Sequence, residues 1–117
     1  MGQKHHGDAL VLKAQEMIEN GPAKNWTVDD LCNTLSIGRR TFERRFKLCT
    51  ANTIAGYVQR VKVEFAKKQL EAGDKTISEI VYETGYVDVD AFRKVFRKVT
   101  DLSPIEYRKK YSSRKPA

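Results

Sequence analysis

Apolar residues recur along this chain at the spacing of amphipathic helices, and the longest such stretch runs from Thr53 to Glu71. Its apolar positions recur every three to five residues, with Tyr57, Ala66 and Gln69 beside them, and are Ile54, Val58, Val61, Phe65 and Leu70. No helix-breaking residue follows Gly56, and Glu64 is placed to pair with Arg60 and Lys68 on the outer face. The pattern predicts one long helix over residues 53–71 that buries this apolar stripe.

Two similar segments flank the long helix. Thr27 and Leu31 of the upstream segment match Thr76 and Ile80 of the downstream segment. Further along, the upstream pair Phe42 and Phe46 matches the downstream pair Phe92 and Phe96. The downstream copy is one residue longer, and the extra residue falls in a turn. Each copy predicts a helix, a tight turn and a second helix, over residues 27–35 and 39–50 upstream and 78–84 and 89–99 downstream. Two copies are too few for a solenoid, so two lobes joined by a helix fit better.

The ends of the chain complete the predicted fold. Residues 8–20 carry another apolar face, which Gly21 and Pro22 terminate, and a last short helix begins near Ser103 and Pro104. We therefore expect an all-α fold. Its first helix-turn-helix subdomain covers residues 8–52, a linker helix covers 53–71 and a second subdomain covers 72–111, between flexible termini at 1–7 and 112–117.

Capping residues support the starts of the repeated helices. Trp26 precedes Thr27, where a large apolar side chain can staple a helix entry to the core; stacking of Trp26 on a base is the alternative. Thr27 is followed at the third position by Asp30, whereas Thr76 is followed by Glu79, the residue more usual in a capping box. We therefore expect the complete box at Thr76.

The outer faces of the second helices in both copies are rich in basic residues. With the Phe pairs turned inward, the outward residues are Arg39, Arg40, Glu43, Arg44 and Lys47 upstream and Arg93, Lys94, Arg97 and Lys98 downstream. Most charged runs are only solvated helix faces, but here the basic face is repeated at matching positions and follows a tight turn. Helix-turn-helix units use that geometry to place the second helix in the DNA major groove. Arg40, Glu43 and Arg44 could then read base edges, and Lys47 and Lys98 could bind phosphate.

Composition narrows the function further. The formal net charge of +7 and the isoelectric point near 9.5 predict attraction to polyanions. Cys32 and Cys49 have neither zinc-ligand nor C-x-x-C spacing, which favours a reducing cytoplasm. No membrane span, signal peptide, catalytic constellation, cofactor motif or metal-ligand set is visible, so neither an enzyme nor a cofactor is expected.

Several motifs resemble the AraC/XylS family of transcription regulators. They are RRTFERRF at 39–46, AKKQL at 66–70, IVYETGYVD at 80–88, FRKVF at 92–96 and DLSPIEYR at 101–108. The resemblance covers nearly all of residues 8–111 and implies seven helices, with two helix-turn-helix units that enter successive major grooves. By the same analogy the base-reading positions are Arg40, Glu43 and Arg44 in the first unit and Ala91, Arg93 and Lys94 in the second.

The chain also departs from the family pattern. Gly38 stands where the family usually has an N-cap Ser, and Ala51 and Asp101 each replace a common Gly. Asp90 replaces a Ser at the DNA-facing start of the second recognition helix, where it suits the helix dipole but repels phosphate. We therefore expect the first unit to read most of the sequence and the second to bind more weakly and electrostatically.

The resemblance also implies partners. Double-stranded operator or promoter DNA is the expected ligand, RNA polymerase is a candidate protein partner, and a separate effector or dimerisation domain is expected in the full regulator. The sequences RTFERRF at 40–46 and YVQRVK at 57–62 are most similar to members whose other domain is glutamine-amidotransferase-like. Two alternatives stay open: a basic helical module that binds an acidic surface of the transcription machinery, and a reactive-thiol protein.

Overall fold

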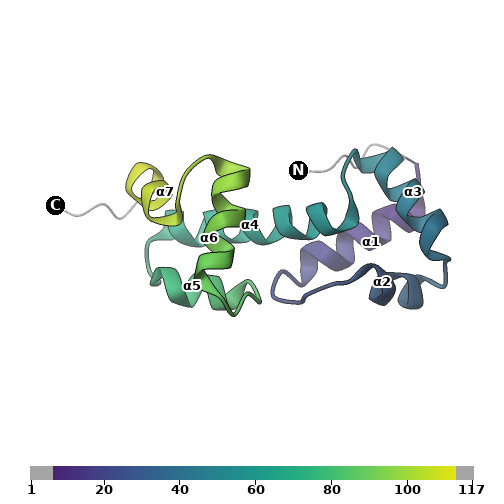
Figure 1. Cartoon of the computed structure of the whole chain (residues 1–117), viewed down its shortest axis with the longest axis horizontal. Helices are drawn as coiled ribbons and strands as arrows, with labels where there is room; N and C mark the ends of the chain where they lie inside the picture. The colour runs from purple at the N-terminus through teal and green to yellow at the C-terminus, as the bar shows by residue number, and fades with distance from the viewer. Residues whose placement is uncertain (1–6, 113–117) are drawn as a thin grey trace. The chain divides into compact units, whose positions relative to one another are not determined.

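The computed structural model describes residues 7–112, and this part of the chain forms seven α-helices with no strand. They are α1 (Ala9–Asn20), α2 (Val28–Leu35), α3 (Arg39–Thr50), α4 (Ile54–Ala72), α5 (Ile77–Glu83), α6 (Val89–Thr100) and α7 (Pro104–Tyr111) (Figure 1). The predicted all-α fold is confirmed. The flexibility predicted for residues 1–7 and 112–117 concerns a range of which only Gly7 and Ser112 are described.

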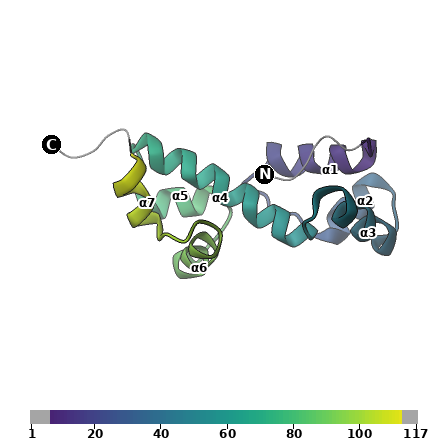
Figure 2. The same ribbon diagram turned by 90° about the horizontal axis from the view of Figure 1, so that it is seen from above.

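The chain divides into two compact units between Val61 and Lys62, within α4. The first unit contains α1, α2, α3 and the first half of α4, and the second contains the rest of α4 with α5, α6 and α7 (Figures 1 and 2). Each unit has its own hydrophobic core, and α4 contributes side chains to both cores.

The internal repeat extends further than the sequence comparison suggested, because the second half of α4 corresponds to α1. Each of these segments buries a Val, an Ala and a branched aliphatic residue at the same spacing, namely Val11, Ala14 and Ile18 in α1 and Val63, Ala66 and Leu70 in α4. Helix α7 matches the first half of α4, as the sequence already indicates by the correspondence of Ser103 and Tyr107 with Thr53 and Tyr57. Each unit is therefore built from four corresponding helical segments, of which the second and third form the helix-turn-helix.

The same aromatic contacts hold the third helical segment in each unit. Phe46 of α3 meets Tyr57 edge-on at 5.4 Å between ring centroids, and Phe96 of α6 meets Tyr107 edge-on at 5.6 Å. The Tyr57 hydroxyl donates a hydrogen bond to the Glu19 carboxylate, as the Tyr107 hydroxyl does to the carboxylate of Glu71. Burial, followed by these hydrogen bonds, raises the pKa of both phenols.

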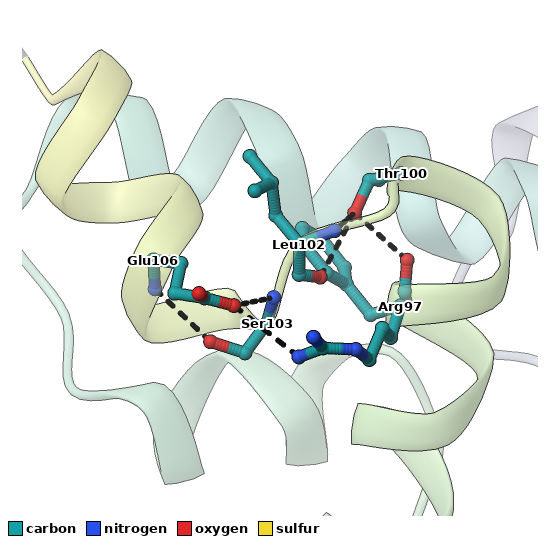
Figure 3. A network of polar contacts seen from close by, with 6 residues as sticks. Arg97, Thr100, Leu102, Ser103 and Glu106 are labelled. Atoms are coloured by element: carbon teal, nitrogen blue, oxygen red, sulfur yellow. Dashed lines mark hydrogen bonds and ion pairs between the residues drawn. The ribbon is translucent and has the colours of Figure 1, made fainter.

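Equivalent polar turns follow α3 and α6. Thr100 Oγ1 donates to the Phe96 carbonyl at 2.8 Å and accepts from the Leu102 amide at 3.1 Å (Figure 3), and Thr50 makes the corresponding bonds at 2.8 and 3.1 Å. The residue after each Thr, Ala51 or Asp101, has a positive φ of 60° or 65°. Gly is the residue that adopts this left-handed conformation without strain, which agrees with the expectation that Gly is common at these positions.

The prediction about the capping boxes is wrong in its assignment. The box is complete at Thr27, because its Oγ1 accepts from the Asp30 amide and an Asp30 carboxylate oxygen accepts from the Thr27 amide. At Thr76 only the first bond forms, since the Glu79 carboxylate accepts from the Thr76 hydroxyl instead of its amide. The length of the side chain does not decide this, because Glu106 completes the box at Ser103 by accepting from its amide at 2.8 Å.

The buried face of α4 also differs from the predicted stripe. Val63 is fully buried in the second core, whereas Phe65 is partly exposed and belongs to neither core cluster. Lys62 is buried as well, although its side chain is charged. The predicted pairs of Glu64 with residues four positions away are replaced by one with Lys67 at 3.1 Å, three positions away. The stripe shifts because each half of α4 faces a different core.

Replacement of Ala51 by Gly should stabilise the protein. A left-handed backbone is strained for Ala but not for Gly, and the greater entropy of unfolded Gly offsets only part of this gain, so we expect about 0.5–1 kcal/mol. Urea unfolding followed by circular dichroism measures the effect. The control is Gly38→Ala, because Gly38 has a negative φ of −67° and offers no such gain. Destabilisation by Ala51→Gly would contradict the inference that the left-handed backbone at residue 51 is strained for Ala.

Candidate nucleic-acid interface

Helix α3 buries Phe42 and Phe46 and presents three basic side chains to solvent, Arg40, Arg44 and Lys47. Within the described residues, none of these three forms an ion pair or a side-chain hydrogen bond. Their charges are available to an anionic ligand, because no carboxylate must first be displaced. Arg40 and Arg44 come from the N-terminal half of α3, the part of a recognition helix that meets base edges, and Lys47 lies in its last turn.

Two other predicted contacts on α3 are bound to each other. Arg39 Nε lies 2.8 Å from Glu43 Oε1, and a second Arg39 nitrogen lies 3.3 Å from a carboxylate oxygen of Asp29 on α2. The Glu43 hydrogen bond is the main reason that the pKa of Arg39 is raised. Both side chains are exposed, and such pairs contribute little to stability, so Glu43 can exchange Arg39 for another donor at small cost.

On the corresponding face of α6 two arginines form ion pairs, whereas on α3 only Arg39 does among the described residues of that face. Arg93 lies 3.2 Å from Asp90, and Arg97 lies 3.3 Å from Glu106 of α7 (Figure 3). Lys94 and Lys98 are exposed and, in the part of the chain that the structure describes, form no ion pair. Of the four basic residues on this face of α6, only Lys94 and Lys98 are without an ion pair among the described residues.

The start of α6 is acidic. Asp88 is the N-cap, and its carboxylate accepts hydrogen bonds from the amides of Asp90 and Ala91 at 2.9 and 3.3 Å. Asp90 follows in the first turn with its side chain 81% exposed, and Ala91 is partly exposed. The first turn of α3 differs, because Gly38 provides no side-chain cap and Arg39 and Arg40 follow directly.

The sequence interpretation missed two exposed residues on α3. Thr41 occupies the position that corresponds to Ala91, and Leu48, which is 78% exposed, corresponds to Lys98. The internal repeat was the signal that could have identified Thr41, since Ala91 was already a candidate. In contrast Arg45 turns inward, where its Nε and a terminal nitrogen bind the carboxylate of Asp8 at 2.9 and 2.7 Å.

The Asp8–Arg45 pair connects α3 to the start of α1. The Asp8 carboxylate also accepts from the amides of Leu10 and Val11, so one side chain caps α1 and holds α3. The hydrogen bond from Arg45 is the main reason that the pKa of Asp8 is lowered. This pair helps to determine which face of α3 is exposed.

The cysteines do not form a reactive centre. Cys32 is buried and Cys49 is partly buried; both are free thiols whose pKa is raised mainly by burial.

Trp26 packs against the first core, which favours its role as an anchor over base stacking. Among the described residues no cluster of three or more His, Cys, Asp or Glu side chains could hold a metal ion. Nor is any helix there long and apolar enough to cross a membrane.

Comparison with known proteins agrees with this arrangement. A family profile described as a helix-turn-helix domain matches residues 31–110. A protein of Streptomyces lividans named as an AraC-like transcription regulator is 33% identical over 102 residues, which cover 87% of this chain and 34% of that protein. The xylose operon regulatory protein of Escherichia coli K12 is 34% identical over 101 residues, which cover 86% of this chain and 26% of that protein. The chain thus spans about a third or less of the length of these relatives.

Solved structures show the same similarity. A xylose-binding transcription activator aligns with a TM-score of 0.83 and 32% identity, over 95% of this chain and 29% of that one. The DNA-binding domain of AdpA, a global transcriptional factor solved in complex with a target DNA, aligns with a TM-score of 0.74 and 28% identity, over 87% and 88% of the two chains.

The repeated helix-turn-helix units and their basic second helices define a DNA-binding domain of a transcription regulator. More particularly, the chain belongs to the AraC/XylS family.

Neutralising Asp90 should strengthen DNA binding. Asp90→Asn removes a negative charge from the start of α6 and releases Arg93, so we expect affinity to rise roughly two- to five-fold at low salt, as for an exposed ion pair. Fluorescence anisotropy with labelled duplex DNA measures this change. Glu16→Gln on the exposed face of α1 makes the same change in charge and should have a smaller effect. Equal effects of both variants would assign the gain to net charge alone.

Proposed function

We propose that this chain is a sequence-specific binding domain for double-stranded DNA that inserts α3 and α6 into adjacent major grooves. The observation that carries the proposal is the repeated division of faces on the two helices. In each, two Phe side chains at i and i+4 are buried and basic side chains at matching positions are exposed. If these were only solvated surface helices, the basic face would not be expected to recur at matching positions in both, each time after a tight turn.

Unequal roles for the two helices follow from their ion pairs. In α3, Arg40 and Arg44 form no ion pair with any other described residue and suit the O6 and N7 acceptors of guanine. Glu43 can accept from the amino group of cytosine once it leaves Arg39. In α6, Arg93 must leave Asp90 before it reads a base, and the exposed carboxylate of Asp90 repels phosphate. We therefore infer that α3 reads most of the sequence.

Phosphate binding is assigned to lysines further along the two helices. Lys47 and Lys98 lie in the later turns of α3 and α6, and both are exposed without an ion pair among the described residues. Contacts of this kind fix the register of the protein on the duplex and supply affinity that does not depend on sequence. Ala91 and Lys94 complete the contacts proposed for α6.

The organisation of the full regulator stays a prediction. The division into residues 8–52, 53–71 and 72–111 is our functional proposal, in which the linker helix connects two DNA-reading lobes. An effector or dimerisation domain, a glutamine-amidotransferase-like partner domain and a contact with RNA polymerase are each implied by family resemblance alone. No contact in the described residues favours the alternative in which the basic faces bind an acidic protein surface.

Alanine substitutions in the two recognition helices test the proposal. Arg40→Ala should lower discrimination between the preferred site and a site with one changed base pair by about 1–3 kcal/mol, because a bidentate base contact is lost. Arg93→Ala should lower it less. Competition binding with matched and mismatched duplexes measures both effects, and equal losses would contradict the ranking of the two helices.

Salt dependence distinguishes DNA contacts that read bases from those that bind phosphate. Lys47→Ala should weaken binding to all sequences similarly and reduce the slope of log affinity against log salt by about one unit. The control is Leu48→Ala at the next position on α3, which changes no charge and should leave this slope unchanged. A wild-type slope near zero would instead support binding to a protein partner.

A further inference from the structure

The turns of the two helix-turn-helix units are held in different ways. In the first unit Ser36 has a left-handed backbone with φ of 54°, and the Ile37 amide donates to the Cys32 carbonyl at 3.2 Å. This bond ties the residue before the N-cap of α3 directly to the end of α2. The turn of the first unit is therefore closed by its own backbone.

The second unit has an additional residue and a different closure. Gly85 supplies the left-handed conformation, with φ of 87°, and Tyr86 packs against Phe92 at 5.1 Å between ring centroids. Val87, which corresponds to Ile37, is 89% exposed, whereas Ile37 packs against the first core. In the described chain the Val87 amide makes no backbone bond like that of Ile37. The backbone alone therefore does not tie Val87 to the end of α5.

A side chain from α4 reaches the end of α5 instead. Lys62 Nζ donates a hydrogen bond to the carbonyl of Thr84, the C-cap of α5, at 2.5 Å. Thr84 is itself fully buried, and its hydroxyl donates to the Val81 carbonyl. The ammonium group satisfies a carbonyl that a helix end leaves without an intrahelical partner, and its positive charge suits the C-terminal dipole of the helix.

The first unit shows that an apolar residue can occupy the same place. Because Val63 corresponds to Val11, Lys62 corresponds to Leu10, which packs against the first core. Lys62 is only 3% exposed, and burial lowers its pKa to about 8. A buried ammonium is costly, and this cost opposes the gain from satisfying the Thr84 carbonyl. Stability alone therefore gives little reason for Lys at this position.

We propose that Lys62 is a positioning residue of the second helix-turn-helix: by holding the Thr84 carbonyl it fixes the α5–α6 turn and hence the placement of α6 on DNA. The inference rests on the proposed function, because it assigns base reading to α6. It extends that function, because discrimination between base pairs by α6 then depends in part on a buried residue of α4. Lys62 itself touches no DNA in this account.

Substitution of Lys62 separates positioning from stability. Lys62→Leu copies the first unit; it removes a buried ammonium but also the donor to the Thr84 carbonyl, so the midpoint of thermal unfolding should change little. Discrimination should fall roughly ten-fold, about the value of one base contact, in the part of the site read by α6. That part is defined as the base pairs at which Lys94→Ala loses discrimination, and the part read by α3 is defined in the same way with Arg40→Ala. The α3 part should be unaffected.

Rescue and charge controls complete the experiment. Lys62→Arg keeps a donor for the Thr84 carbonyl and should restore most of the discrimination. Lys68→Leu removes the same charge from an exposed position of α4 and should leave both parts of the site unchanged. In ¹H–¹⁵N spectra the amides of Tyr86, Val87 and Asp88 should shift in Lys62→Leu and return toward wild type in Lys62→Arg.

The outcomes distinguish failure of this inference from failure of the proposed function. Full discrimination by Lys62→Leu in both parts of the site would overturn the positioning role, and so would equal losses in both parts. The role would also be overturned if Lys62→Arg discriminated no better than Lys62→Leu. If the wild-type protein itself discriminates no base pair, the proposed function fails, and the role of Lys62 on DNA fails with it.

Discussion

The contact between the recognition helix and a Tyr–Glu pair is the constraint on which each unit depends. Phe46 and Phe96 pack edge-on against Tyr57 and Tyr107, whose hydroxyls are held by carboxylates on the helix that opens the unit. Because the preceding Phe lies four residues earlier on the same face, the orientation of α3 or α6 about its axis is determined. The basic residues have only the opposite face left, so the core determines which side chains can meet DNA.

Much of this arrangement could be predicted from the sequence, because it depends on residue type and spacing. The Phe pairs, the caps at Thr27 and Ser103 and the extra residue near Gly85 are local signals, and each predicted helix is present. The placement of the candidate residues on exposed faces followed from the same periodicity. The correspondence between α1 and the second half of α4 was missed, because the helices share only small and aliphatic residues at the buried positions.

Other features depend on three-dimensional contacts that spacing does not determine. Glu43 and Arg39 could each face solvent or each other, and the choice depends on rotamers and on Asp29 from a neighbouring helix. Phe65 fitted the predicted stripe, but the second core takes Val63 instead. The burial of Lys62 was likewise invisible, because a Lys at this position of an amphipathic helix reads as a surface residue.

The two units thus share a framework but differ where they would meet DNA. Within residues 7–112, the first has two arginines without an ion pair on α3 and a turn closed by its backbone. The second has paired arginines on α6, an acidic first turn and a turn whose end is bound by a buried lysine. Duplication accounts for the common core, and the differences lie in turn and surface residues, where changes cost little stability. Such surface changes can alter one unit without loss of the other's fold.

Selection of bound sequences from a random duplex pool, at roughly physiological salt and with unselected DNA as competitor, tests the central claim most directly. Two recognition helices that read DNA predict enrichment of one motif that spans two adjacent major grooves, with the stronger information content in one half. Arg40→Ala should erase that stronger half. No enriched motif, together with binding that disappears on a modest increase in salt, would contradict the account and leave only nonspecific attraction to polyanions.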